Sequence, residues 1–328
     1  MRRFLDQPVW VRVIRGILLA AAVAAVAFYT PTPYLLEAPG RTVPVSDIIK
    51  IADQQAHPVN GQFLMATILV EKASVMLCLY GLLDPDATLT RTSPEAVGEQ
   101  AQSPHDSQQM GFSQYLSTRA ALEKLGYQVR GQYLGLLIVN LDQASPNLDR
   151  LKPGDLIVEL AGRKAPTLED FNALIRSETA QKKLAVVIER AGKRFPLQLD
   201  VVMLRGRMRI GVLFRPEYDD IKLPVEIHFQ SGNTSGASAG LVFALEIYDQ
   251  LSPVDLGKGR IIAATGTIDS QGRVGGIEGL PFKLIGVERA HADVFLVPRE
   301  NWHEIKNIAT KVKVIPVATL QEAIDALQ

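Results

Sequence analysis

The sequence contains a single cysteine, Cys78, among 328 residues. One cysteine excludes an internal disulfide and any metal site built from several thiolates. Cys78 lies in an apolar run, where cysteine more often serves as a small core residue than as a reactive thiol, so we expect it in the core. The five histidines are scattered, and none completes the His-Glu-x-x-His pattern of a zinc peptidase. We therefore expect neither a metal nor a cofactor.

The sequence also lacks an excess of charge of either sign. Its 35 basic residues balance 35 acidic ones, and neither sign forms a long block. This balance gives no electrostatic case for a nucleic-acid partner. The phosphate-binding pattern Gly-x-x-x-x-Gly-Lys-Ser/Thr is missing as well. ATP-driven unfolding of a substrate is therefore not encoded in this sequence.

Residues 1–36 predict a membrane anchor or signal segment. Four arginines precede an uncharged run from Gly16 to Tyr29 that is rich in alanine, leucine and valine, and charge remains absent through Leu36. A helix that spans a membrane needs about 20 apolar residues. The run from Gly16 to Tyr29 is shorter, but the uncharged stretch from Gly16 to Leu36 reaches that length and favours a single-pass anchor over a cleaved signal. Because the basic residues come first, the positive-inside tendency places the rest of the chain outside the cytoplasm.

The remaining sequence predicts an α+β multidomain fold, because 328 residues exceed one typical core. Residues 37–125, with a strand-like run at 61–70 and a helical pattern from about 109, predict a linking subdomain that packs with the C-terminal domain. Residues 126–204 predict a β-rich domain of short strands with one helix over 167–177. Strands and helices then alternate, which predicts an α/β domain over 205–328.

The β-rich segment 126–204 resembles a PDZ domain, on the triplet Leu134, Gly135 and Leu136 and on the run Leu-Lys-Pro-Gly-Asp at 151–155. The resemblance implies that the loop containing the triplet presents backbone amides to a peptide carboxylate. It also implies that a neighbouring strand edge pairs with the peptide, because an exposed edge needs a partner strand. The alternative is a small packing domain that binds nothing.

A run of small residues surrounds Ser238 where an amphipathic helical pattern begins, and Lys283 follows 45 residues later. A serine hydroxyl is a weak nucleophile that needs a base to take its proton during attack. Lysine can act as that base only when it is neutral. With an ordinary pKa of about 10.4, only about one lysine in a thousand is neutral at pH 7.4, a cost of about 4 kcal/mol.

The sequence around Lys283 favours a lowered pKa. Leu280, Leu284 and Val287 lie on its side of the predicted helix, and burial disfavours an ammonium ion. Pro281 suits the first helical position, which places Lys283 in the opening turn, where the helix dipole also disfavours a cation. The alternative is a surface lysine whose stem covers apolar residues while its charge reaches water.

Ser238 also has a structural alternative, because serine is a common helix N-cap. Its small neighbours favour a catalytic role over a cap. Gly236, Ala237, Ala239 and Gly240 leave room for a substrate backbone and for amides directed at an oxyanion.

Four segments together resemble the proteolytic domain of Lon-type proteases. An N-terminal anchor, a PDZ domain and this domain, in that order, resemble the membrane-anchored Lon-like endopeptidases of bacteria. The resemblance implies a Ser-Lys dyad at Ser238 and Lys283, with Thr265 holding the lysine and with Gly236 and Ala237 in support. The chain departs from the family at Ala237, where proline is common, and in a longer stretch before Lys283. The four segments are Gly236–Leu241, Ala264–Ile268, Gly272–Val274 and Ile277–Lys283.

The favoured interpretation is an ATP-independent serine endopeptidase that cleaves unfolded, membrane or secreted polypeptides outside the cytoplasm, with capture of their tails by the PDZ domain. The resemblance also suggests assembly into a homo-oligomer. One alternative is a catalytically silent membrane scaffold whose PDZ domain recruits tails. Another is a kinase-like phosphate binder, because Gly232, Gly236 and Gly240 frame a helix N-terminus suited to anions.

Overall fold

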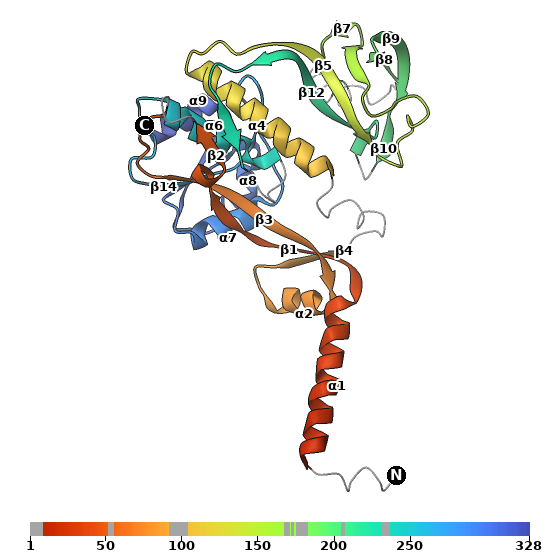
Figure 1. Ribbon diagram of the computed structural model, residues 1–328, viewed down its shortest axis with the longest axis vertical. Coiled ribbons are helices and arrows are strands. Elements are labelled where there is room, and N and C mark those ends of the chain that lie inside the picture. Colours follow the sequence, from red (N-terminus) through yellow and green to blue (C-terminus); the bar gives the residue numbers. More distant parts are fainter. Residues whose placement is uncertain are drawn as a thin grey trace.

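The computed structural model describes residues 9–51, 56–91, 104–166, 171, 174, 183–204, 207–230 and 237–328. Helix α1 (Val9–Tyr29) projects away from the rest of the chain, and a long two-stranded ribbon joins it to the main body (Figure 1). A second, smaller body of strands lies at the other end of the molecule (Figure 1).

The main body is built on a six-stranded sheet in the order β18-β17-β14-β3-β1-β4. Strand β14 runs parallel to both β3 and β17, whereas β1 and β3 are antiparallel. The predicted linking subdomain and the predicted C-terminal domain therefore contribute strands to one sheet. The strands are β1 (Pro31–Pro44), β3 (Gln62–Ser74), β4 (Thr88–Arg91), β14 (Ile261–Ala264), β17 (Val294–Pro298) and β18 (Lys313–Val317).

Side-chain alternation along these strands creates a core on each face of the sheet. On β3, Phe63 and Met65 join one core while Leu64 and Ala66 join the other, as the two-residue period of a strand requires. Helices α4 (Pro104–Lys124), α6 (Gly240–Leu251) and α9 (Leu320–Leu327) supply the first core. Helices α7 (Leu280–Arg289) and α8 (Trp302–Ile305) supply the second.

Helix α7 lies directly against β1. A Cβ atom added at Gly286 would come within 2.7 Å of the carbonyl oxygen of Gly40, so no larger residue fits at this contact. The absence of a side chain therefore fixes how closely α7 approaches the strand.

The smaller body is a sheet in the order β12-β5-β6-β8-β9, with β7 paired to β6. Its predicted helix over 167–177 falls mostly outside the described residues. Short two-stranded pairs complete the chain. The bounds are β5 (Arg130–Leu141), β6 (Leu156–Leu160), β7 (Arg163–Lys164), β8 (Lys183–Arg190), β9 (Lys193–Asp200) and β12 (Val212–Lys222), with pairs β2 (Ile49–Ile51)/β13 (Ile227–Phe229), β10 (Val202–Leu204)/β11 (Arg207–Arg209) and β15 (Thr267–Ile268)/β16 (Val274–Gly275).

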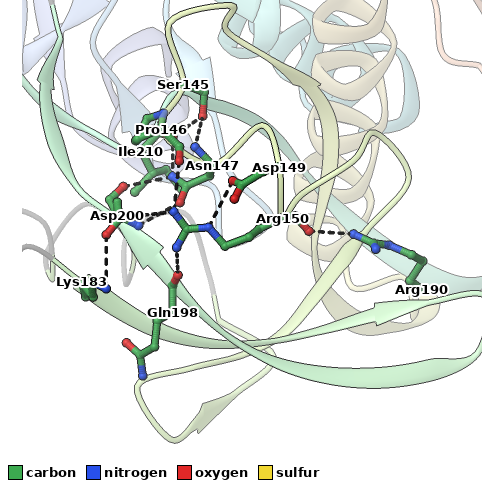
Figure 2. A network of polar contacts seen from close by, with 10 residues as sticks. All are labelled: Ser145, Pro146, Asn147, Asp149, Arg150, Lys183, Arg190, Gln198, Asp200 and Ile210. Atoms are coloured by element: carbon green, nitrogen blue, oxygen red, sulfur yellow. Dashed lines mark hydrogen bonds and ion pairs between the residues drawn. The ribbon is translucent and has the colours of Figure 1, made fainter.

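Paired charges hold the loop after β5 against this sheet (Figure 2). The Arg150 guanidinium donates to the Asp200 carboxylate and to the Gln198 carbonyl at 2.5 Å. Nearby, Arg190 donates to both oxygens of Asp155, at 2.6 Å each. The Asp155 side chain is only 1% exposed, so its charge is buried together with a bidentate partner.

The predicted membrane anchor receives no support from the structure. Among the residues described, no helix combines the length and the apolar character needed to cross a membrane. The expected segment also ends inside β1, where Leu35 and Leu36 are buried and pair with Lys72 and Glu71.

The expectation that Cys78 is a core residue is wrong. Cys78 lies on α2 (Val75–Leu83), where it is half-buried and its sulfur is 3.3 Å from the hydroxyl of Thr32. No residue of α2 is buried. An apolar run indicates that a segment avoids water, but the sequence alone does not say what covers that segment.

Candidate active site

Ser238 lies in a single 3-10 turn, Ala237–Ala239, immediately before α6. The N-cap of α6 is Ala239, and no side chain caps the helix, so Ser238 is not the helix cap. Its hydroxyl oxygen lies 2.7 Å from the amine of Lys283 instead. The structure thus brings together two residues that are 45 positions apart in the sequence.

Lys283 lies in the first turn of α7. Gly279 caps this helix in the left-handed conformation, with a φ of 71°, and a proline follows within the first two helical positions. The Lys283 side chain points into the protein and is 2% exposed. Leu280, Leu284 and Val287 are buried beside it, as their helical spacing predicts.

Burial lowers the pKa of Lys283 to about 8, because desolvation disfavours the ammonium form. Within the described residues, the amine contacts two hydroxyl groups and no carboxylate. With this pKa about one amine in five is neutral at pH 7.4, and the cost of the free base falls from about 4 to about 1 kcal/mol. A substantial fraction of the buried Lys283 amine is therefore neutral at pH 7.4 and can accept a proton.

Thr265 lies at the end of β14 and contacts both members of the pair. It is fully buried, and its hydroxyl accepts a hydrogen bond from the Lys283 amine at 3.1 Å. The same hydroxyl donates to the Ser238 carbonyl at 3.1 Å, and the Gly266 amide donates to that carbonyl at 2.8 Å. Thr265 and Gly266 thus hold the serine backbone while Thr265 orients the lysine.

Ser113 on α4 is a site residue that sequence reasoning missed. It is 3% exposed, and its hydroxyl donates to the carbonyl of Ala237 at 3.2 Å. The residue before Ser238 is therefore held from α4, 124 positions away in the sequence. Nothing in the local pattern of α4 distinguishes Ser113 from a serine that packs in the core.

Of the two predicted supporting residues, Ala237 and Gly236, the structure describes only Ala237. Ala237 lies in the turn beside Ser238, with its carbonyl bonded to Ser113. Gly236 lies outside the described residues. His228, one of the five scattered histidines, is exposed on β13 and hydrogen-bonds Glu226 at 2.9 Å.

The predicted carboxylate-binding triplet is not a free loop. Leu134, Gly135 and Leu136 lie within β5, where Gly135 pairs with Glu217 of β12 and Leu136 pairs with Ile157 of β6. A Cβ atom at Gly135 would meet the Ile157 carbonyl oxygen at 2.1 Å, which explains the glycine. Gly135 and Leu136 are therefore part of the paired sheet, and the triplet does not form the separate loop that the resemblance implied.

Residues 124–201 match the family model of the PDZ domain, and residues 201–327 match that of the Lon protease (S16) C-terminal proteolytic domain. Strands β5 to β9 of the smaller sheet therefore belong to a PDZ domain, whereas β12 of that sheet falls within the second match. The segment with Ser238 and Lys283 is a serine peptidase domain of the Lon type. The second match begins after β1, β3 and α4, although these elements share its sheet and core.

Curated relatives agree with this class. The chain is 32% identical to a Lon protease of Neorickettsia sennetsu over 106 residues, which is 30% of this chain and 13% of that protein. It is 32% identical to a Lon protease of Xanthomonas oryzae pv. oryzae over 134 residues, or 39% of this chain and 15% of that protein. The chain thus spans less than one sixth of the length of these relatives.

Part of the chain is also similar to solved structures of PDZ domains. The PDZ domain of an SdrC-like protein from Listeria monocytogenes is 22% identical, with a TM-score of 0.24, and the likeness covers 26% of this chain and 93% of that one.

Proposed function

We propose that this protein is an endopeptidase that hydrolyses peptide bonds of unfolded polypeptides with a Ser238–Lys283 dyad. One observation carries the proposal: the buried Lys283 amine lies 2.7 Å from the Ser238 hydroxyl and has no carboxylate beside it among the described residues. A lysine in such a place can be neutral, and a neutral amine at that distance can take the serine proton.

In the proposed reaction, the Ser238 oxygen attacks the peptide carbonyl carbon as its proton moves to the Lys283 nitrogen. The tetrahedral intermediate then collapses, the peptide C–N bond breaks, and the Lys283 ammonium returns the proton to the leaving amine. Water hydrolyses the acyl-enzyme by the same proton route, which regenerates the serine hydroxyl. Thr265 keeps the amine directed at the serine, since it contacts both.

The PDZ domain, in this proposal, captures a substrate segment along the outer edge of β12 rather than at the Leu134–Leu136 triplet. One edge of β12 pairs with β5, and within the described part of the chain no strand pairs with the other. An extended peptide can add to such an edge through backbone hydrogen bonds. Tyr218 of β12 stacks near Tyr115 of α4, with ring centroids 5.0 Å apart, and α4 also carries Ser113. Capture there would raise the local substrate concentration.

We further propose that cleavage needs no ATP. The chain matches only the proteolytic part of its long relatives, and its sequence holds no phosphate-binding loop. Without a motor, substrates must arrive already unfolded. A homo-oligomer is also part of the proposal, and light scattering of the purified protein measures it directly.

The proposed location is a membrane, with the peptidase on the extracytoplasmic side. Support comes from the exposed apolar side chains of α1, among them Ile17, Leu18 and Leu19, and from arginines that precede the uncharged run. Cell fractionation with alkaline washing, followed by external protease treatment of intact cells, tests both the attachment and the side.

The decisive test of the activity uses the full chain in mild detergent with casein and no nucleotide. We expect cleavage that falls at least about 10⁴-fold in Ser238→Ala and in Lys283→Met. Lys313→Met is the matched control, because Lys313 is an exposed lysine on β18 of the same domain. Retained cleavage in Lys283→Met refutes the dyad. An inactive parent protein, with or without ATP, favours the scaffold alternative.

A further inference from the structure

Helix α2 has one face toward the protein and one face toward the outside. At about 100° per residue, Leu77, Cys78 and Gly81 share a side, and a Cβ atom at Gly81 would come within 2.7 Å of Leu36 and 3.0 Å of Leu89. This face therefore packs on β1 and β4. The opposite face consists of exposed apolar and aromatic side chains, namely Val75, Met76, Leu79, Tyr80, Leu82 and Leu83.

This outward face does not suit contact with water. The nine residues of α2 include no charge, and Leu82 and Leu83 are 74% and 84% exposed. A helix on the surface of a soluble protein normally carries polar residues on its outer face. Large exposed apolar patches mark a site of contact with a protein or a membrane.

The apolar surface of α2 continues onto α1. The Val75 amide, at the start of α2, donates to the Thr30 carbonyl just beyond α1 at 3.1 Å, and the two helices contact each other. In Figure 1, α2 lies beside the ribbon at the end where α1 emerges. The exposed apolar residues on α1 point to several sides of that helix, as Ile17, Leu18, Leu19, Val26 and Phe28 show. A second copy of the chain would cover one side, whereas lipid surrounds a helix.

Tyrosines and charges lie where a lipid–water boundary would place them. Tyr29, Tyr34 and Tyr80 are exposed around the junction of α1, β1 and α2. Tyrosine is enriched at the membrane–water boundary because its ring is apolar and its hydroxyl is polar. The Tyr80 hydroxyl donates to Asp84 at 2.5 Å, and Asp84 is the first charged residue after the apolar helix.

We propose that α2 is a membrane-contacting helix that lies in the interfacial layer of the bilayer beside the end of α1. Its outward face rests on lipid, and its inward face holds the β1–β3 ribbon, so the protein touches the membrane at two points. This inference rests on the proposed membrane attachment and adds to it a second contact that fixes the orientation of the body.

The test places an environment-sensitive fluorophore on single cysteines of the full chain in liposomes of phosphatidylcholine and phosphatidylglycerol. The background is Cys78→Ser, which keeps a polar atom near Thr32. The test position is Leu82→Cys. Leu19→Cys on α1 reports attachment, and Leu148→Cys, another exposed leucine, reports water at the PDZ domain. Doxyl-labelled lipid and aqueous iodide serve as the two quenchers, and casein cleavage is measured in the same liposomes.

We expect the probe at residue 82 to emit at shorter wavelength than the probe at 148, to lose fluorescence to doxyl lipid and to resist iodide. If residue 82 behaves like residue 148 while residue 19 is quenched by lipid, α2 does not touch the membrane and only this inference fails. If residue 19 also behaves like residue 148, the inference and the attachment fail together, while casein cleavage reports the peptidase independently. Disulfide crosslinking between Leu82→Cys copies would assign the surface to a second copy and overturn the proposal.

Discussion

The PDZ domain and the peptidase domain treat a buried charge in opposite ways. Asp155 of the PDZ domain is almost fully buried, and Arg190 binds both of its oxygens. Lys283 of the peptidase domain is equally buried, but its described partners are two neutral hydroxyls. The Arg190–Asp155 pair fixes the loop that carries Arg150 and Asp155. Burial lowers the pKa of Lys283 to about 8, and with no carboxylate among its described partners the amine can serve as a base.

The two domains of this protein thus use the desolvation of a buried charged group in two ways. A buried charge with a partner serves structure, since desolvation is offset by charge-assisted hydrogen bonds. A buried amine without a counter-charge weakens the fold but gains reactivity at neutral pH. Changes that add a partner at one site, or remove it at the other, test this contrast.

Among the changes that test this contrast, the largest effect is expected from giving Lys283 a counter-charge. Thr265→Asp would place a carboxylate beside the amine and raise the pKa of Lys283, by about 2 units for a close pair, so cleavage at pH 7 should fall roughly 100-fold. The pH profile should shift upward, with activity partly recovered near pH 10. Thr265→Ser keeps the hydroxyl and serves as the control. An unshifted profile in Thr265→Asp would contradict this account.

Removing the partner in the PDZ domain should act on stability instead. Arg190→Met removes the charged partner of the buried Asp155 carboxylate and should destabilise the PDZ domain by roughly 2 kcal/mol. This loss is smaller than that for a fully buried pair, because Arg190 is partly exposed. Hydrogen exchange in residues 150–160 measures this, while cleavage of a short peptide should stay unchanged. Arg194→Met breaks the exposed Arg194–Glu189 pair and should cost less than about 0.5 kcal/mol. Equal effects of the two changes would refute the contrast.

The unmodified enzyme should show the pH dependence of an unpaired lysine. Only the neutral amine accepts the serine proton, so kcat/KM should rise about tenfold per pH unit below the Lys283 pKa of about 8 and level off above it. A plateau that begins below pH 7 would show that another group is the base. Initial rates on a fluorogenic peptide between pH 6 and 9.5 are the measurement.

A smaller effect is expected at Ser113. Ser113→Ala removes the hydrogen bond to the Ala237 carbonyl, worth about 1 kcal/mol, so kcat should fall about fivefold with little change in KM. Ser117→Ala is the matched control, since Ser117 is buried on the same helix and its hydroxyl donates to the Gln114 carbonyl within that helix. Equal rates in both variants would assign Ser113 a purely structural role.

Much of the candidate site could be predicted because its signals are local. The apolar residues around Lys283 recur at helical spacing, and proline and glycine mark the start of α7. Ser113 gave no such signal, since its role depends on a contact across 124 positions. The triplet at 134–136 was expected in a loop, and residue identity does not reveal that Gly135 pairs with β12 and Leu136 with both β12 and β6.

The fold was predictable within segments and less so between them. The alternation of strands and helices after residue 210 was visible in the sequence. The pairing of β3 with β14 joins residues about 200 positions apart, and periodicity carries no information on such partners. The exposed face of α2 was missed because an apolar run looks the same whether protein or lipid covers it.

The close contact between α7 and β1 relates the position of Lys283 to that of α1. Gly286 lies against Gly40, which is nine positions along the strand from Pro31, the first residue of β1, a span of about 30 Å. Lys283 lies one turn from that contact, so the β1–β3 ribbon that joins α1 to the main body (Figure 1) sets the distance between the Ser238–Lys283 pair and the end of α1. If α1 attaches the protein to a membrane as proposed, this distance limits cleavage to polypeptide segments that extend far enough from the bilayer to reach Ser238.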